Sequence, residues 1–314
     1  MTKSNVIIDV PLPDFLAEVF SQDCEFFGWE ALEASEAVRS SITGILSYTH
    51  TLIGDAEFDR LPNVRVVSNY GVGFDHIDVV AAASRGIPVG NTPGTVDGAT
   101  ADMTMALLLA VARNLVQGDR YARGPEFLAF DPAHMLGRDV FGATLGIIGL
   151  GRIGKEVAKR ARGFDMTLLY HNRRRDPDAE LALGAEYCDL PSLLARADFV
   201  SLNCPLTPET KGIIGDKQLR QMKPTGFLIN TARGAVIDHD ALYEALAGGW
   251  IAGAAIDVPE PEPLPRDHPL LALDNLIFAP HLGTSTIDTR LTMAEMTRAN
   301  LVAGLRGEPL AHPV

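Results

Sequence analysis

Three glycines near the middle of the chain follow a short apolar run, in the sequence Thr144-Leu-Gly-Ile-Ile-Gly149-Leu-Gly151-Arg-Ile-Gly154. This pattern predicts a buried strand that turns into a helix, which the helix-compatible residues Lys155–Gly163 continue. Gly149 permits the tight turn, Gly151 allows the backbone to approach a pyrophosphate, and Gly154 allows the helix to pack closely on the strand. Because the N–H groups at a helix N-terminus attract anions, the motif predicts a dinucleotide site. A glycine-rich structural turn is the alternative.

The residues after the next apolar run indicate which dinucleotide binds. A site for NAD usually has an acidic residue about 20 residues beyond the glycines, and this residue binds the ribose 2′-hydroxyl. Here that position is Asn172, and Arg173, Arg174 and Arg175 follow it. A carboxylate would repel a 2′-phosphate, whereas guanidinium groups bind phosphate through paired hydrogen bonds. The sequence therefore predicts NADP (as NADPH) over NAD, with Arg173 and Arg174 as the phosphate contacts. A solvated basic turn is the alternative.

The composition limits the classes of protein and partner. A chain of 314 residues, 46% of them hydrophobic, is long enough for two domains with sizeable cores. Its net charge of −13 disfavours a nucleic-acid partner, which needs a basic surface. The three cysteines lack metal-site spacing, and the longest apolar run, near Met105–Ala112, is too short to span a membrane. No leader peptide opens the sequence, so we expect a cytoplasmic protein with no metal and no membrane partner.

Short β-branched runs alternate with helix-compatible stretches on both sides of the glycine motif. Before it we predict strands at Val6–Val10, Ile45–Tyr48, Val64–Ser68 and Ile87–Gly90, and helices at Asp14–Phe20, Glu30–Ser40 and Val79–Ser84. After it we predict strands at Met166–Tyr170, Phe199–Asn203, Gly226–Asn230, Ala252–Ile256 and Leu276–Ala279. Such alternation is typical of a parallel sheet with helices on both faces. The sequence therefore predicts two α/β units, with a long apolar helix at Asp97–Leu115 leading toward the second.

The stretch Gly124–Gly142 interrupts this alternation. It contains aromatic residues and two prolines, and it has neither helical nor strand periodicity. Long irregular loops are uncommon in compact domains unless they are functional. An arm that packs on a second subunit and a long surface loop are both consistent with this sequence.

Three predicted strand ends carry charged or titratable residues, in the segments Leu228-Ile-Asn-Thr-Ala-Arg233-Gly-Ala, Asp257-Val-Pro-Glu-Pro-Glu262-Pro and Phe278-Ala-Pro-His281-Leu-Gly-Thr. Ligands of an open parallel sheet bind beyond the carboxyl ends of its strands. Arg233 can bind a carboxylate bidentately. His281 can exchange a proton near neutral pH, and Glu262 can orient its imidazole and favour the charged form. Taken singly, these residues have alternative interpretations as a surface cation, a loop histidine and a solvated acid. Their occurrence together after a dinucleotide motif favours catalysis.

These motifs together resemble the D-isomer-specific 2-hydroxyacid dehydrogenase family, over nearly the whole chain. The resemblance rests on the segments Asn91-Thr-Pro-Gly, Ala101-Asp102, Gly149-Leu-Gly-Arg-Ile-Gly, Cys204-Pro-Leu-Thr-Pro-Glu-Thr, Asn230-Thr-Ala-Arg-Gly and Pro280-His-Leu-Gly. The spacings from Arg233 to Glu262 and from Glu262 to His281 are also similar to those of the family. Within it, Tyr170-His-Asn-Arg and the run from Pro280 to Arg290 resemble the NADPH-preferring glyoxylate/hydroxypyruvate reductases.

The resemblance implies a fold and an assembly. It implies two Rossmann-like or flavodoxin-like parallel-sheet domains with a cleft between them. The substrate domain would be discontinuous, comprising residues 1–98 and 286–314, and the NADP-binding domain would comprise residues 99–285. Members of the family are homodimers, which the resemblance connects with an arm at residues 113–143.

The resemblance also implies roles for individual residues. The substrate carboxylate would bind Arg233 and the backbone amides of Val72 and Gly73. Hydride would pass between nicotinamide C4 and substrate C2 while His281, paired with Glu262, supplies a proton to the ketone oxygen. Around the pyrophosphate, ribose and nicotinamide the dinucleotide would contact the glycines, Arg152, Ile153, Cys204, Pro205, Thr210, Thr231, Ala232, Arg233, Asp257, His281 and Gly283. Pro205 and Asp257 have alternative interpretations as a turn residue and a cap.

Two features leave the preferred ketoacid open. The segment Gly124–Phe130 has no Trp where the family often has one, and Tyr70 precedes the glycine loop, where it can admit or exclude larger ketoacids. We expect an NADPH-dependent reductase of small 2-ketoacids, glyoxylate and hydroxypyruvate, with bulkier aryl pyruvates as an alternative. A dinucleotide-sensing corepressor of the same fold is a further alternative, which the intact Arg233, Glu262 and His281 disfavour.

Overall fold

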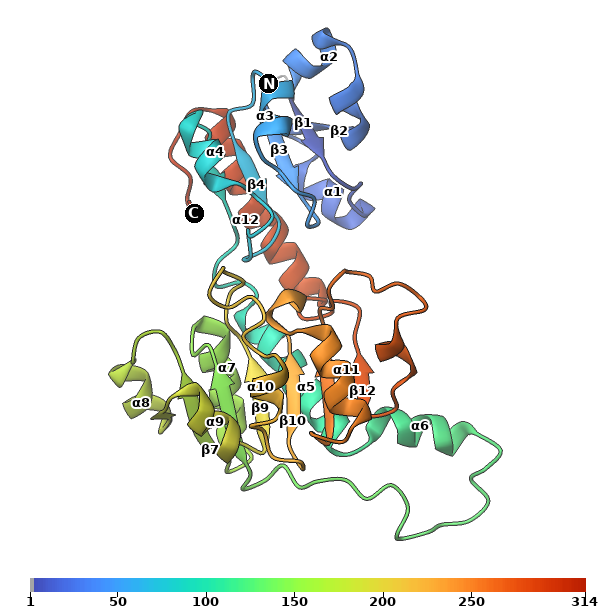
Figure 1. Ribbon diagram of the computed structural model, residues 1–314. Coiled ribbons are helices and arrows are strands. Elements are labelled where there is room, and N and C mark those ends of the chain that lie inside the picture. Colours follow the sequence, from blue (N-terminus) through green and yellow to red (C-terminus); the bar gives the residue numbers. More distant parts are fainter. Residues whose placement is uncertain (1–2) are drawn as a thin grey trace. The chain divides into compact units, whose positions relative to one another are not determined.

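The computed structural model describes residues 3–314, and the chain divides into two compact units. The first runs to Val96 and resumes at Ser285–Val314, and the second is Asp97–Thr284. Each unit is built around its own parallel sheet, with helices packed against it (Figure 1). The predicted α/β class with two parallel sheets is confirmed.

Among the described residues, the sheet of the first unit has five parallel strands in the order β2-β1-β3-β4-β5. The strands are β1 (Ser4–Ile8), β2 (Cys24–Gly28), β3 (Gly44–Ser47), β4 (Val67–Asn69) and β5 (Val89–Gly90). The helices are α1 (Asp14–Phe20), the 3-10 helix η1 (Trp29–Glu33), α2 (Glu36–Ser41), α3 (Asp55–Arg60), α4 (Val79–Ser84) and α12 (Ile287–Leu305). This is one of the two common doubly wound strand orders.

The first unit differs from the prediction in three elements. The single helix predicted at Glu30–Ser40 is instead η1 followed by α2, because Ala34 and Ser35 between them have extended backbone angles. Strand β2 and helix α3 have no predicted counterpart. Strand β2 lies at the edge of the sheet and most of its residues are partly exposed, so it lacks the continuous apolar run of a central strand.

The C-terminal residues extend the opposite edge of this sheet. Beyond α12, the tail runs beside β5, where the Asn91 N–H donates to the His312 carbonyl at 3.1 Å. The Val314 N–H donates to the Val89 carbonyl at 2.9 Å. The tail therefore pairs with a strand edge that would otherwise be open.

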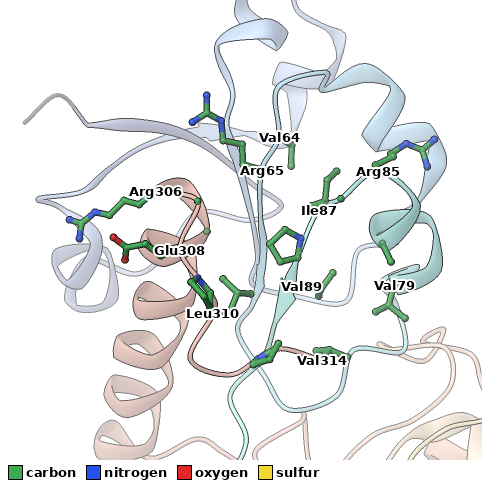
Figure 2. Close-up of a pocket in the computed structure, with 17 residues that line it drawn as sticks. Val64, Arg65, Val79, Arg85, Ile87, Val89, Arg306, Glu308, Leu310 and Val314 are labelled. Carbon is green, nitrogen blue, oxygen red and sulfur yellow. The ribbon is translucent and has the colours of Figure 1, made fainter.

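A cavity of about 920 Å³ opens beside this tail (Figure 2). Figure 2 shows Arg65, Arg85 and Arg306 around it with their guanidinium groups turned away from the hollow. Arg85 forms ion pairs with Asp55 at 2.6 Å and Asp59 at 2.7 Å. None of the predicted site residues lines this cavity, so the residues with predicted chemistry lie elsewhere.

The sheet of the second unit, as described, has seven parallel strands in the order β12-β11-β10-β9-β6-β7-β8. The strands are β6 (Thr144–Ile148), β7 (Thr167–His171), β8 (Glu186–Tyr187), β9 (Phe199–Leu202), β10 (Phe227–Asn230), β11 (Gly253–Ile256) and β12 (Leu276–Phe278). The helices are α5 (Asp97–Ala112), α6 (Leu115–Arg123), α7 (Arg152–Arg162), α8 (Pro177–Leu183), α9 (Leu190–Arg196), α10 (Asp216–Leu219), η2 (Gly234–Val236), α11 (His239–Ala247) and η3 (Pro269–Ala272). Chain order reverses between β6 and β9, which makes their carboxyl ends a topological switch point.

Both faces of this second sheet are buried. Successive strand residues alternate between two apolar cores: Phe199 and Ile229 face the core that contains α5 and α7, whereas Val200 and Leu228 face the core that contains α9 and α11. This arrangement explains why the predicted strands read as continuous apolar runs.

The helix predicted at Asp97–Leu115 is shorter than expected. Helix α5 ends at Ala112, and Asn114 adopts a left-handed conformation with φ of +51° before α6 begins at Leu115. The two helices are bent by 60°. In the described chain no single helix is long and apolar enough to cross a membrane. The bent pair α5 and α6, taken together, has the length and the apolar composition of a membrane span. Most of α5 is buried in the core beside α7.

The segment Gly124–Gly142 contains no helix or strand, as its lack of periodicity predicted. Figure 1 shows it as a long loop that follows α6. Several of its apolar side chains are exposed, including Leu128 at 89% and Phe130 at 83%. At its far end the Arg138 N–H donates to the Ala112 carbonyl at 2.8 Å, which anchors the loop to the end of α5.

We expect Asp198→Asn to lower the unfolding temperature at neutral pH but to have little effect in acid. The Asp198 carboxylate accepts the Thr144 N–H at 2.9 Å and pairs with Lys223 at 2.8 Å, at the amino ends of the strands. Burial opposes ionisation, but these partners outweigh it and the pKa of Asp198 lies below its ordinary value of 3.8. The folded state therefore binds this proton less readily than the unfolded state. Its stabilisation is present above pH 3.8 and is lost as the pH falls through the lowered pKa.

Thermal unfolding followed by circular dichroism across the acid range measures this effect. A partly exposed pair contributes about 1 kcal/mol or less, which corresponds to a decrease of at most about 2–4 °C for a unit of this size. Asp216→Asn is the control, because its pair with Arg220 is exposed at the surface. A decrease of the same size at every pH would contradict the assignment.

Candidate functional site

The predicted site residues of the second unit follow the carboxyl ends of six adjacent strands. The glycine turn follows β6, the basic turn that begins at Asn172 follows β7, and four further residues follow β9, β10, β11 and β12 in the same way: Cys204, Arg233, Asp257 and His281. Because the strands are parallel, these residues lie along one edge of the sheet. This is the edge at which open parallel sheets bind ligands.

The glycine turn has the geometry that its sequence predicts. Gly149 has φ of +99°, and a Cβ there would lie 2.5 Å from the backbone nitrogen of Cys204. A Cβ at Gly154 would overlap the carbonyl oxygen of Gly149. A Cβ at Gly151, in contrast, would meet no heavy atom within 4 Å. The turn therefore leaves open space beside the N-terminus of α7, where Arg152 is exposed, and this space fits a pyrophosphate.

Two residues of the basic turn have structural partners. The Asn172 Oδ1 accepts the Leu150 N–H at 2.7 Å, so this side chain holds the glycine turn in place. Arg175 donates to both carboxylate oxygens of Glu180, each at 2.7 Å. Arg173 and Arg174 are exposed, and neither forms an ion pair within residues 3–314. They are therefore the arginines of this turn that remain accessible to a ligand.

His281 and Glu262 form a pair at the end of β12. The His281 Nδ1 and the Glu262 Oε1 are 2.8 Å apart, and both side chains are about one-third exposed. Because a carboxylate accepts hydrogen bonds, the proton on Nδ1 points to Glu262. His281 also has φ of +54°, a left-handed conformation that residues other than glycine rarely adopt.

Asp257 holds the backbone around this histidine. It is 1% exposed, and its carboxylate accepts the Leu282 N–H at 2.6 Å and the Gly283 N–H at 2.7 Å. Its carbonyl accepts the His281 N–H at 2.9 Å. Burial raises the pKa of Asp257, whereas the two amide bonds favour its ionised form. Three bonds from one residue thus hold His281 in its strained conformation and orient the imidazole through the backbone.

The turn that carries Arg233 is held by the last residue of β10. The Asn230 side chain is fully buried, donates to the Arg233 carbonyl at 2.9 Å and accepts the Ala232 N–H at 3.0 Å. A Cβ at Gly234 would overlap the backbone of Pro259, so only glycine fits there. The base of the Arg233 side chain is therefore fixed on both sides.

Other predicted cofactor residues at this edge already have partners. Thr210 Oγ1 donates to the Pro205 carbonyl at 2.6 Å, and this hydrogen bond closes the turn that contains Pro205. Thr231 Oγ1 shares a hydrogen bond of 2.8 Å with Thr104 of α5. Burial raises the pKa of Cys204 to about 11, so its thiol is neutral at physiological pH. The site is thus bounded by uncharged groups on the β9 side.

The predicted substrate loop of the first unit follows β4. Tyr70, at its start, is 5% exposed, and its hydroxyl donates to the Arg290 carbonyl at 2.7 Å. Burial raises the pKa of Tyr70 to about 12. The phenol is therefore held by α12 within the first unit. Val72 and Gly73, the residues predicted to bind a carboxylate, are partly exposed.

The sequence motifs predict no role for Asn230, and they predict Asn172 as a cofactor contact but not as a partner of Leu150. Asn230 does have a local signal, because an Asn at the end of a strand often accepts the N–H of the residue two positions ahead, as in an Asx turn. The contact of Asn172 with Leu150 and the contact of Asp257 with Leu282 have no local signal, since each joins residues more than twenty positions apart.

We expect opposite effects from alanine at two glycines of the turn. Gly154→Ala forces a Cβ against a backbone oxygen, so it lowers the stability of the protein by about 1–3 kcal/mol. Gly151→Ala meets no protein atom and leaves stability unchanged, but its methyl group occupies the space predicted for the pyrophosphate. Thermal unfolding and fluorescence titration with NADPH measure the two effects. A Gly151→Ala variant that binds NADPH as tightly as the unmodified protein would contradict the placement.

Comparison with known proteins agrees with this geometry. The model of the NAD-binding domain of D-isomer specific 2-hydroxyacid dehydrogenases matches residues 105–283. The glyoxylate reductase of Korarchaeum cryptofilum is 54% identical over 256 residues, which are 81% of this chain and 77% of that protein. The glyoxylate reductase of Pyrococcus furiosus is 45% identical over 299 residues, which are 94% of this chain and 88% of that protein.

Solved structures give the same result. A protein from Thermus thermophilus is 41% identical, with a TM-score of 0.90 over 99% of each chain. The NADPH-dependent glyoxylate/hydroxypyruvate reductase of Sinorhizobium meliloti, in complex with NADP and malonate, is 30% identical, with a TM-score of 0.89 over 100% of this chain and 97% of that one. With the glycine turn, the His281–Glu262 pair and these relatives in agreement, the chain belongs to the D-isomer-specific 2-hydroxyacid dehydrogenase family.

Proposed function

We propose that this protein is an NADPH-dependent reductase that converts small 2-ketoacids, glyoxylate and hydroxypyruvate, to D-2-hydroxyacids. The observation that carries the proposal is the contact between His281 Nδ1 and Glu262 Oε1, at the strand edge that also carries Arg233 and the glycine turn. The family to which the chain belongs and its similarity to glyoxylate reductases also support this proposal. The three free, buried cysteines suit a reducing compartment such as the cytoplasm.

Reduction of a ketone requires a hydride at carbon and a proton on oxygen. NADPH, when bound, supplies the hydride to C2 of the ketoacid. We assign the proton to His281: with Nδ1 bonded to Glu262, the protonated imidazole donates from Nε2 to the ketone oxygen. The Glu262 carboxylate stabilises the imidazolium before the transfer and keeps the ring in one orientation. His281 and Glu262 are thus the proposed proton relay.

The substrate carboxylate requires donors of its own. We assign it to Arg233, whose planar guanidinium can donate two parallel hydrogen bonds, and to the backbone amides of Val72 and Gly73. We also propose that residues 1–98 and 286–314 form the substrate domain and that residues 99–285 form the NADP-binding domain.

The dinucleotide is assigned to the glycine turn and the strand edge. Gly149, Gly151, Gly154, Arg152 and Ile153 are the proposed pyrophosphate contacts, supported by the open space at Gly151. Asn172, Arg173 and Arg174 are assigned to the 2′-phosphoribose, with NADP favoured and NAD disfavoured. The ribose and nicotinamide are assigned to the edge residues Cys204, Pro205, Thr210, Thr231, Ala232, Arg233, Asp257, His281 and Gly283.

We also propose a homodimer formed through the arm at residues 113–143. Exposed apolar side chains gather on α6 and the loop after it, namely Leu115, Phe127, Leu128, Phe130, Leu136 and Phe141. Monomeric proteins rarely expose large apolar patches, and burial of these side chains in a subunit contact removes them from water. Light scattering measures the mass, and a dimer is the expected result.

Steady-state kinetics test the proposed function. We expect reduction of glyoxylate and hydroxypyruvate with NADPH, at higher kcat/KM than phenylpyruvate, an aryl pyruvate. A preference for phenylpyruvate would favour the bulkier substrates. Dinucleotide binding without turnover of any 2-ketoacid would favour a sensing protein and overturn the proposal.

We expect Glu262→Gln to lower kcat/KM for ketoacid reduction. The carboxylate 2.8 Å from the His281 Nδ1 orients the imidazole and accepts its proton in a charge-assisted hydrogen bond, whereas a neutral amide cannot provide that charge. Loss of a charge-assisted bond of about 1.5–3 kcal/mol predicts a decrease of roughly tenfold to hundredfold. Glu260→Gln, an exposed acid on the same segment, is the control. An unchanged kcat/KM would remove Glu262 from the relay.

Replacing Arg173 and Arg174 by serine should raise the KM for NADPH far more than that for NADH. The exposed guanidinium groups are screened by solvent, so we expect a loss of roughly tenfold to hundredfold in kcat/KM with NADPH. Arg175→Ser is the matched control, because its guanidinium is bonded to Glu180 and should leave the cofactor ratio unchanged.

Adding Asn172→Asp to the double variant should then reverse the preference. The Asp carboxylate can still accept the Leu150 N–H, as Asn172 Oδ1 does, while its charge repels a 2′-phosphate. Kinetics with both cofactors measure the ratio. Equal use of NADH and NADPH by the unmodified protein would mean that the arginines form a solvated turn.

A further inference from the structure

All three carbonyl groups of the loop Gly71–Gly73 accept hydrogen bonds from residues at the ends of β4 and β5. The Asn69 Nδ2 donates to the Gly71 carbonyl at 2.9 Å and to the Gly73 carbonyl at 2.8 Å. The Gly71 carbonyl also accepts the Thr92 N–H at 3.1 Å. The Asn91 Nδ2 donates to the Val72 carbonyl at 2.8 Å. Side-chain amides at the ends of β4 and β5 thus fix three successive carbonyl groups.

Both asparagines are buried and lie on neighbouring strands. Asn69 is the last residue of β4 and is 2% exposed, whereas Asn91 directly follows β5 and is 8% exposed. The two strands pair in parallel, so their carboxyl ends lie side by side beneath the loop. An Asn amide has two N–H donors, and Asn69 uses them on two carbonyl groups.

This arrangement determines where the amides of the loop point. In a planar trans peptide the C=O and the following N–H point in opposite directions. Holding the Gly71 and Val72 carbonyl groups toward the asparagines therefore turns the Val72 and Gly73 N–H groups away from them. Within residues 3–314, neither N–H donates a hydrogen bond to the protein, and the loop is partly exposed. Two adjacent amide donors are thus available on one side of the loop.

We propose that Asn69 and Asn91 are positioning residues for carboxylate recognition, because they orient the Val72 and Gly73 amides that bind the substrate. The inference rests on the proposed function, which assigns the ketoacid carboxylate to these amides. Neither asparagine contacts the substrate in this scheme. Donors that are already oriented need no rearrangement when the anion arrives, so they favour binding of the carboxylate.

Helix α12 supports the same arrangement from behind. The Asn300 side chain is fully buried, and its Nδ2 donates to the Asn91 carbonyl at 2.9 Å. Its Oδ1 accepts the His312 N–H at 3.0 Å. The backbone of Asn91 is therefore held by α12 and the C-terminal tail, while its side chain remains directed to the loop.

The test replaces each asparagine by aspartate, which has the same shape but no N–H donor when ionised. Asn69→Asp removes two bonds to the loop, and Asn91→Asp removes one. Asn275→Asp is the matched control. Its Nδ2 also donates to two backbone carbonyl groups, those of Leu246 and Ala252 at 3.2 and 3.4 Å, but it lies at the amino end of β12.

We expect the KM for glyoxylate to rise about 10- to 100-fold in Asn69→Asp and to rise less in Asn91→Asp, as charge-assisted bonds to the carboxylate are lost. The KM for NADPH and the kcat should change by no more than about twofold, and Asn275→Asp should leave every constant unchanged. A purely structural role would instead lower the amount of active protein without changing KM. Should Asn69→Asp fail to fold, Asn91→Asp decides alone. Folded variants with the unmodified KM for glyoxylate would overturn the inference.

Calorimetry with oxalate, on NADPH-loaded protein, separates this inference from the proposed function. Oxalate carries the carboxylate but does not react, and we expect its binding to weaken in Asn69→Asp and Asn91→Asp in parallel with the rise in KM. If the unmodified protein reduces glyoxylate and all variants bind oxalate equally, only the inference fails. If the unmodified protein neither reduces a 2-ketoacid nor binds oxalate, the proposed function fails as well.

Discussion

Parallel strand pairing is the constraint on which the rest of this molecule depends. In each unit every described strand pairs in parallel, so all the carboxyl ends lie on one edge and the loops that follow them share it. In the second unit this edge carries the glycine turn, Arg233, Asp257 and His281. Residues far apart in the sequence therefore meet without any direct attraction between them, because the hydrogen-bond ladder of the sheet places them.

The loops at these edges are held by buried polar side chains. Asp257 holds the histidine loop, Asn230 holds the arginine turn, and Asn69 and Asn91 hold the loop of the first unit. Each is buried and bonded to backbone groups, which is the condition under which a buried polar group stabilises a structure. In this proposed enzyme they set the direction of groups that act on the ligand, and the reacting groups themselves remain partly exposed.

Local patterns predicted much of the fold and many of the site candidates. The glycine spacing predicted the strand, turn and helix at β6 and α7, because the backbone of the turn leaves no room for a Cβ at Gly149 or Gly154. The alternation of apolar runs predicted the parallel sheets. The pattern failed at two places: Asn114 adopts a left-handed conformation that interrupts the apolar helix, and the edge strand β2 lacks the apolar run of its neighbours.

Motifs and their spacing identify the family, the glycine turn and the residue types available for chemistry. Packing sets which of these side chains have protein partners and which stay accessible. Arg175 is bonded to Glu180, and Tyr70 is held by α12, whereas Arg173 and Arg174 remain accessible. The reason is physical: a side chain's availability depends on its partners in space, and those partners lie on other elements whose positions only the packed sheets and helices define.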